Sequence, residues 1–205
     1  MNWTVGFLQK WWQPQRAVLS IHLREDSSPW VMGLAIDRGC LHFDRVLEVG
    51  VTPSNPQLFA NGGLVAEDGL MALMEATLNA LRASSKVAPK SVVFVLPAQQ
   101  CFLGQVTVGL EDSEEDIQFQ VEDMLDEVMG YDAEPMTYDW QQRSASTTYA
   151  ERQLAVAAMH QKQLEVFERV CHQKGLSCLG ITLDHVAALN ACQRAGLGRT
   201  DASKD

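Results

Sequence analysis

Two apolar runs far apart in the chain constrain its fold more than any other feature. The first is Ser91–Leu96, which stops at Pro97, and the second is Leu154–Met159. Continuous runs of this kind are typical of strands buried on both faces, because a half-exposed strand alternates apolar and polar residues. The residues between the two runs follow other periods. The sequence therefore predicts a buried sheet that is interrupted by an insertion with elements of its own.

The insertion has a strand period, then a helical period, then a strand period. Alternation over 101–110 places five residues on one strand face: Phe102, Gly104, Val106, Val108 and Leu110. Helical spacing over 113–129 places five residues on one stripe: Ile117, Val121, Met124, Leu125 and Val128. Met136, Tyr138 and Trp140 alternate again. With the second apolar run, these segments predict a strand–helix–strand–strand subdomain over 98–159.

The remaining segments supply the interrupted sheet. Residues 17–23, 32–36 and 41–49 are predicted strands in consecutive antiparallel hairpins, because the connections are too short for parallel crossovers. Helices are predicted over 67–84, with Leu70, Met71, Met74, Leu78 and Leu81 inward, and over 161–174, ending at Gly175. A strand over 178–183 and a last helix from Asp184, burying Val186, Leu189 and Cys192, complete a mixed α/β core.

Composition and charge exclude several classes of protein. The chain has 205 residues, 46% hydrophobic and 20% charged, as expected for a folded globular protein. A net charge of −10 with no basic stripe argues against nucleic-acid binding. No apolar run reaches the roughly 20 residues of a membrane helix, and no signal peptide is visible. Five scattered cysteines favour buried free thiols, so we expect a cytoplasmic protein.

No motif in the sequence predicts catalytic, cofactor-binding or metal-binding residues. The Walker, G-x-G-x-x-G and G-x-S-x-G patterns are missing, and the five histidines lack ligand spacing. Cys171, His172 and Cys178 suggest a metal cluster, but a core position for Cys171 is the favoured interpretation. The acidic run 111–116 suggests a cation site or, by the favoured interpretation, a solvated helix start.

Several short segments, in their order and spacing, carry a resemblance to a known family. They are 93–97, 106–110, the 115–129 helix, Glu134-Pro135 with 138–140, then 155–158, 174–176 and 182–184. Over about residues 17–195 the chain resembles the first half of an actin-like ATPase domain. More narrowly, it is similar to the type IV pilus assembly protein PilM and its short HofM, ComA and MshI relatives. The resemblance implies an actin-like (RNase H-like) half-domain, with a core of 17–97 and 160–196, the inserted 98–159, and a loose tail at 197–205.

Two departures from this family bear on nucleotide binding. PilM-like ATPases have a glycine-serine phosphate loop between their first two strands, whereas residues 22–29 here contain no glycine. In an alternative register, 17–23 is an added strand and Asp37 and Gly39 fall in the phosphate loop. The second actin-like domain is also missing from the sequence. We therefore expect no enzyme activity and no cofactor.

The resemblance implies an interaction module for a type IV pilus system, possibly a mannose-sensitive one. In the family, the cytoplasmic protein docks the short cytoplasmic segment of a PilN-like bitopic inner-membrane protein in a groove between the main subdomain and its insert. Here the groove would lie near the two crossings between core and insert, so the expected partner-binding residues are Leu96, Pro97, Phe102, Met159 and His160, for which simple hinge packing is the alternative. Membrane contact would be indirect, through that partner. The alternative function is an actin-like ATP-binding protein or pseudo-ATPase completed by a partner.

The first 16 residues form a predicted amphipathic segment. Its aromatic and aliphatic residues share one helical face: Trp3, Phe7, Leu8, Trp11 and Trp12. We expect this face to pack on the chain's own sheet, with contact to a second copy or to a partner as the next candidate. A membrane-surface helix is the third candidate, because such helices usually have a basic polar face and this segment has only Lys10 before Pro14.

Overall fold

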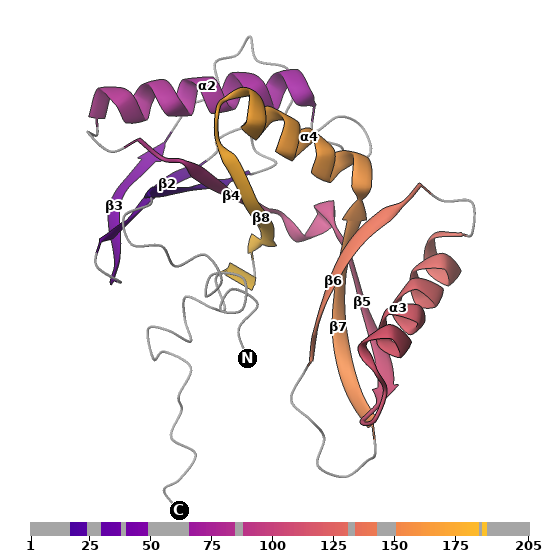
Figure 1. Ribbon diagram of the computed structural model, residues 1–205. Coiled ribbons are helices and arrows are strands. Elements are labelled where there is room, and N and C mark those ends of the chain that lie inside the picture. The colour runs from indigo at the N-terminus through magenta and orange to yellow at the C-terminus, as the bar shows by residue number, and fades with distance from the viewer. Residues whose placement is uncertain are drawn as a thin grey trace, which may run out of the picture. The chain divides into compact units, whose positions relative to one another are not determined.

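A computed structural model describes residues 17–23, 30–37, 40–48, 66–84, 88–130, 134–142, 151–184, 186 and 187 (Figure 1). The chain divides into two compact units. The small unit is Gln99–Glu165, and the large unit comprises the segments before and after it. The predicted amphipathic segment 1–16, the tail 197–205, Leu189 and Cys192 lie outside the described residues.

The large unit contains a five-stranded mixed sheet in the order β3-β2-β1-β4-β8. Its strands are β1 (Ala17–His22), β2 (Trp30–Asp37), β3 (Cys40–Glu48), β4 (Ser91–Leu96) and β8 (Ser177–Leu183). β2 is antiparallel to both β1 and β3, whereas β4 is parallel to both β1 and β8. The predicted hairpins are confirmed, and the strands predicted over 91–96 and 178–183 lie in the same sheet, as a single mixed core requires. β4 lies inside the sheet and is buried at five of its six positions, as the apolar run predicts.

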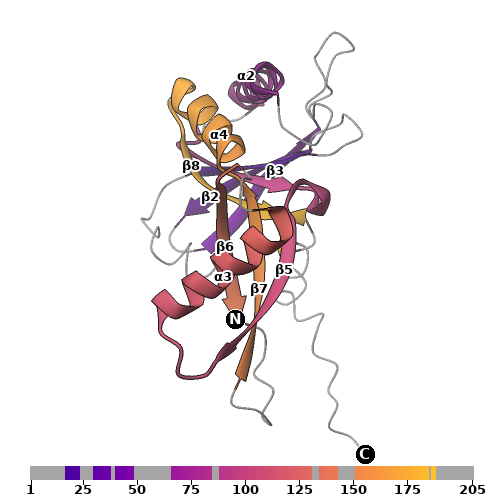
Figure 2. The ribbon, with the colours of Figure 1, turned by 90° about the vertical axis from the view of Figure 1, so that its right-hand side faces the viewer.

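Helices α2 (Glu67–Ser84) and α4 (Gln161–Gln173) lie on the same side of this sheet (Figures 1 and 2). The Phe167 ring of α4 packs on the Phe94 ring of β4, with centroids 4.6 Å apart. α2 buries Leu70, Leu73, Met74, Leu78 and Leu81, so Leu73 takes the inward place predicted for Met71. Arg169 of α4 pairs with Glu67 of α2, a surface contact that adds little beside the apolar packing.

The pairing of β1 decides between the two registers of the first hairpins. β1 is hydrogen-bonded on one side to β2 and on the other, in parallel, to β4. It is therefore the first strand of the sheet and not an added one. The turn after Asp37 connects β2 to β3, so the alternative register, with Asp37 and Gly39 in a phosphate loop, is wrong.

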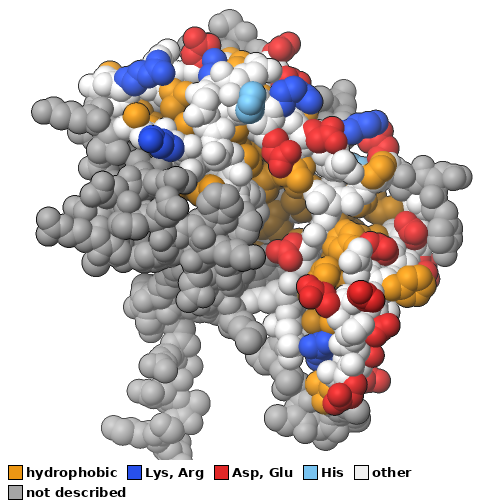
Figure 3. Space-filling view, viewed as in Figure 1, with side chains coloured by type: hydrophobic (Ala, Val, Ile, Leu, Met, Phe, Trp, Pro, Cys, Tyr) orange, Lys and Arg blue, Asp and Glu red, His pale blue; other side chains and the backbone are white. Residues whose placement is uncertain are grey.

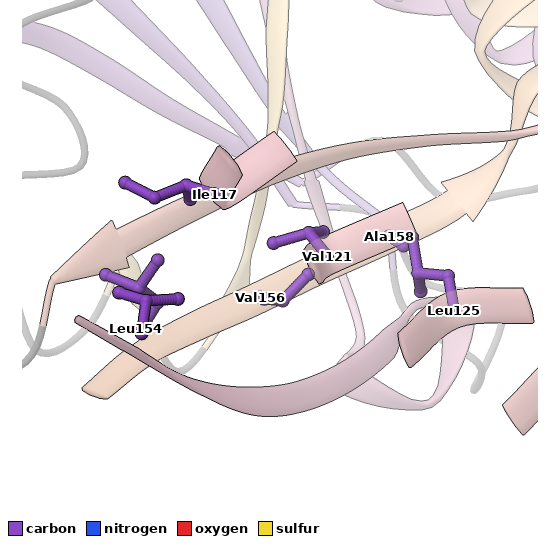
Figure 4. Close-up of a cluster of buried hydrophobic side chains, with 7 residues drawn as sticks. Ile117, Val121, Leu125, Leu154, Val156 and Ala158 are labelled. Carbon is purple, nitrogen blue, oxygen red and sulfur yellow. The ribbon is translucent and has the colours of Figure 1, made fainter. Parts of the chain in front are cut away.

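The small unit contains a three-stranded antiparallel sheet in the order β5-β7-β6, with one helix on one face. Its elements are β5 (Phe102–Gly109), α3 (Glu114–Met129), β6 (Met136–Gln142) and β7 (Glu151–His160), after the short turn η1 (Ala98–Gln100). Ile117, Val121 and Leu125 of α3 lie against three residues of β7, namely Leu154, Val156 and Ala158 (Figure 4). This core explains why the insertion has its own strand and helix periods.

Three details of the small unit differ from the prediction. Ala155 and Ala157 of β7 are only half-buried, so this strand is not buried on both faces, because α3 covers one face of the sheet. Val128 is 56% exposed, since the buried stripe of α3 ends at Leu125. Leu110 is 49% exposed, because the chain leaves β5 at Gly109 and turns.

The acidic run is the start of α3, in agreement with the favoured interpretation. Ser113 is the N-cap residue: its hydroxyl accepts a hydrogen bond from the Asp116 amide, and the Asp116 carboxylate accepts one from the Ser113 amide. The Ser113 hydroxyl also donates to the Asp116 carboxylate, and this bond, followed by the one from the Ser113 amide, holds the pKa of Asp116 below its usual value. The Asp112 carboxylate accepts hydrogen bonds from the Gly109 amide and from Gln120. Both acids therefore shape the turn into the helix.

Candidate partner-binding site

Of the five predicted partner-binding residues, Leu96, Pro97 and Phe102 flank the point where the chain enters the small unit, and Met159 and His160 come shortly before the point where it leaves. Leu96 is the last residue of β4, pairs with Leu183 of β8 and is fully buried, and Pro97 after it is also buried. These two residues belong to the large unit, whereas Phe102, Met159 and His160 belong to the small one. Met159 is buried, and Phe102 and His160 are half-buried. Partial exposure therefore makes Phe102 and His160 the accessible members of the set.

The strand register places the three small-unit residues of this set on two different faces of the sheet. Phe102 pairs with Ala158, so Phe102 and His160, two residues further along β7, lie on the face of the sheet that α3 covers. Met159 pairs with Thr137 of β6 and lies on the opposite face. An extended ligand on the α3 face would therefore contact Phe102 and His160 but not Met159.

Three buried polar atoms near the same end of the small unit have no hydrogen-bond partner among the described residues. They are Oε1 of Gln100, Nδ1 of His160 and Nε2 of Gln163. Gln100 comes just before β5, His160 ends β7, and Gln163 lies in the first turn of α4 with only 4% of its surface exposed. A buried polar atom without a partner costs free energy, so these atoms are available to bind a ligand or ordered water. Sequence periodicity gave no signal for Gln100 or Gln163.

Two contacts hold the start of α4 against the start of β6 in this region. The Gln161 amide donates to the carbonyl of Pro135 at 2.9 Å, and Lys162 forms an ion pair with Glu134. The hydrogen bond from Lys162 is the main reason why the pKa of Glu134 lies below its usual value. His160 lies directly before α4 and pairs with Met136 of β6, so these two contacts restrain the backbone on both sides of it.

The ring of Phe102 requires a glycine beneath it. A Cβ atom at Gly104 would lie 2.7 Å from Cε1 and 2.9 Å from Cζ of that ring, closer than carbon atoms approach. The Cε atom of Met124 on α3 would lie 3.3 Å from the same Cβ atom. The absence of a side chain at Gly104 thus allows the Phe102 ring to lie over the β5 backbone.

The described residues offer no group of three or more metal-ligating side chains. Cys171 is a buried free thiol on α4, as predicted, and His172 beside it is exposed. The contact with Cys178 on β8, together with burial, raises the pKa of the Cys171 thiol. Burial raises the pKa of Cys101 to about 11, which keeps it a neutral thiol.

No described helix is long and apolar enough to cross a bilayer.

Comparison with solved structures shows the fold. No protein-family model matches the sequence, and no curated protein gives a significant match. A chain of the PilM–PilN type IV pilus biogenesis complex is 16% identical, with a TM-score of 0.70 over 89% of this chain and 52% of that one. The cytoplasmic domain of EpsL, an inner-membrane component of the type II secretion system of Vibrio cholerae, is 12% identical, with a TM-score of 0.46 over 82% of this chain and 57% of that one.

The match to the PilM–PilN chain agrees with the actin-like mixed α/β fold predicted from the sequence. At 16% identity this likeness shows the fold alone. The chain spans about half the length of the matched chain, which is 52% covered.

Proposed function

We propose that the chain is a non-catalytic interaction module that docks a short extended segment of a bitopic inner-membrane protein, as part of a type IV pilus or related secretion assembly. The observation that carries the proposal is the fold match to a chain solved in a PilM–PilN complex, over 89% of the present chain. By this proposal the chain works in the cytoplasm and reaches the membrane through a PilN-like partner. The same hypothesis includes a mannose-sensitive pilus system as one assembly that the chain would serve.

The unpaired polar atoms supply a physical reason for docking at the end of the small unit. An extended peptide offers a main-chain N–H and C=O at every residue, and it gains affinity when these groups find partners. Gln163 Nε2 is a donor and Gln100 Oε1 an acceptor, whereas His160 Nδ1 takes either role according to its tautomer. Each hydrogen bond completed by a ligand would remove the cost of a buried unpaired group, about 1–3 kcal/mol. Phe102 adds a half-buried apolar surface for one side chain of the peptide.

Affinity capture from membranes tests the proposal. The purified full chain, immobilised and incubated with a detergent-solubilised inner-membrane fraction, is expected to retain a single-pass protein with a short cytoplasmic N-terminal segment. The Phe102→Ala variant should retain less of it, and Leu103→Ala is the control because Leu103 faces the other side of β5 and is 48% exposed. Equal retention by wild type and both variants would place docking away from Phe102. Retention of no single-pass protein would contradict the proposed function.

A further inference from the structure

The outer face of α3 carries an exposed aromatic ring surrounded by carboxylates. Phe119 is 69% exposed and lies on the side of the helix opposite to the buried stripe of Ile117, Val121 and Leu125. Its neighbours three and four positions away are all acidic: Glu115, Asp116, Glu122 and Asp123. We call Phe119 and these four acids the α3 outer face. A single exposed apolar side chain is ordinary, but a ring with acids at all four neighbouring helical positions is an unusual setting.

Negative charge is concentrated in the same unit. Residues 99–165 contain 14 of the 26 acidic residues and 3 of the 16 basic ones, so this segment has a formal charge of −11 and the rest of the chain +1. Figure 3 shows the acidic side chains gathered over this unit. The excess of acid is thus a property of the insertion and not of the whole surface.

The basic side chains described in this unit are engaged away from the α3 outer face. Arg152 donates to the backbone carbonyl of Asp112 at 3.1 Å, and Lys162 pairs with Glu134. Within the face, the hydrogen-bond donors are neutral. Glu122 accepts from Tyr138 and Gln118, and Asp116 accepts from Ser113. These bonds favour the ionised carboxylates, so the negative charge is held in place without a described cation to balance it.

We propose that the α3 outer face is a docking surface for a basic segment of a protein partner, which places a lysine or arginine side chain over the Phe119 ring. Such a side chain would gain from the ring face and from the carboxylates around it, and its alkyl stem would cover apolar surface. A second copy of the small unit, an anionic bilayer and a nucleic acid are all disfavoured, because each brings more negative charge to a segment of charge −11. The proposal does not depend on the function proposed above.

Fluorescence anisotropy with a short labelled peptide of alternating arginine and leucine, added to the full chain, tests the proposal. Phe119→Ala leaves the charge unchanged and is expected to weaken binding about threefold, the effect of losing one exposed cation–ring contact. Leu103→Ala is the matched control, because it removes another exposed apolar side chain of the small unit and should leave the affinity unchanged. Chemical-shift changes on adding the peptide should centre on α3.

A pair of charge variants completes the experiment. Glu115→Gln/Asp123→Asn removes two carboxylates of the face and should weaken binding about tenfold at low salt, whereas Glu151→Gln/Glu165→Gln removes two charges elsewhere in the unit and should weaken it much less. Equal effects of the two double variants, or no effect of Phe119→Ala, would show attraction by net charge alone and overturn the proposal. It would also be overturned if Phe119→Ala converted a dimer to a monomer in sedimentation, since the occupant would then be a second copy.

Discussion

In the candidate site, the Phe102 ring leaves no room for a side chain at Gly104. Replacing Gly104 with alanine would put a methyl group 2.7 Å from the Phe102 ring, so the ring must move. Because Phe102 is half-buried, the ring can shift outward, and we expect a loss of about 1 kcal/mol in the free energy of unfolding. Urea denaturation measures this loss.

Two controls separate this clash from a general weakening of β5. Thr107→Ala changes an exposed residue on the opposite face of the strand and should leave stability nearly unchanged. Adding Gly104→Ala to a Phe102→Ala background should cost much less than in the wild type, since the ring is gone. Equal costs in the two backgrounds would show that the ring is not the obstacle.

Tyr138 and Glu122 link β6 to α3 and give the small unit a pH dependence. Burial, and then the hydrogen bond to Glu122 at 2.5 Å, raise the pKa of Tyr138 to about 12 from the usual tyrosine value of 10.0. The folded state thus favours the protonated phenol. Its contribution to stability is complete below pH 10 and is lost as the pH rises through about 12.

An ultraviolet absorbance titration of the wild type minus that of Tyr138→Phe isolates this ionisation. We expect a midpoint near 12, and a lower midpoint in Glu122→Gln because the carboxylate that disfavours the phenolate is removed. A Tyr138 midpoint near 10 in the wild type would mean that the phenol is solvated and that the contact with Glu122 does not persist in solution.

At the scale of the element, α3 depends on the cap at Ser113. Ser113→Ala removes the acceptor for the Asp116 amide and is expected to cost about 1 kcal/mol. Amide hydrogen exchange should show the loss in the first turn of α3, while Ser113→Asp, which keeps an acceptor, should restore protection. Unchanged exchange in Ser113→Ala would contradict the capping geometry. The benefit of the Asp116 carboxylate should also disappear as the pH falls, because its folded-state pKa is lowered.

Hydrophobic periodicity was sufficient to predict the elements, and it failed where burial depends on the neighbouring element. The predicted burial holds for Ile117, Val121 and Leu125 of α3 and for five of the six residues of β4, because neighbouring elements cover them. Ala155 and Ala157 look equally apolar in the sequence, yet they are half-buried because a single helix covers their sheet. Small side chains do not reveal which face of a strand is covered.

The candidate site was less predictable than the fold for a related reason. Phe102 and His160 were found from their position at the chain crossings, and the register then placed Met159 on the other face. Gln100 and Gln163 drew no attention, because a glutamine in a sequence looks the same whether its amide is solvated or buried without a partner. That difference is a matter of tertiary packing alone.

At the scale of the whole molecule, we predict that the chain neither hydrolyses ATP nor binds it tightly. Residues 23–29, between β1 and β2, contain no glycine, so backbone amides cannot easily close around a phosphate there. Thermal denaturation with millimolar magnesium–ATP should therefore give the same melting temperature as without it. A rise of several degrees would favour the alternative function, a nucleotide-binding protein, because a ligand that binds the folded state stabilises it by mass action.

The most direct test of the docking account is a calorimetric titration of the full chain with the synthetic cytoplasmic segment of the single-pass protein recovered from membranes. The account predicts one site per chain, with affinity reduced about tenfold by Phe102→Ala and by Gln163→Leu, which removes a buried donor that the segment would use. Leu103→Ala should bind as the wild type does. Absence of binding, or equal binding by the wild type and all three variants, would contradict the claim that this end of the small unit docks the partner.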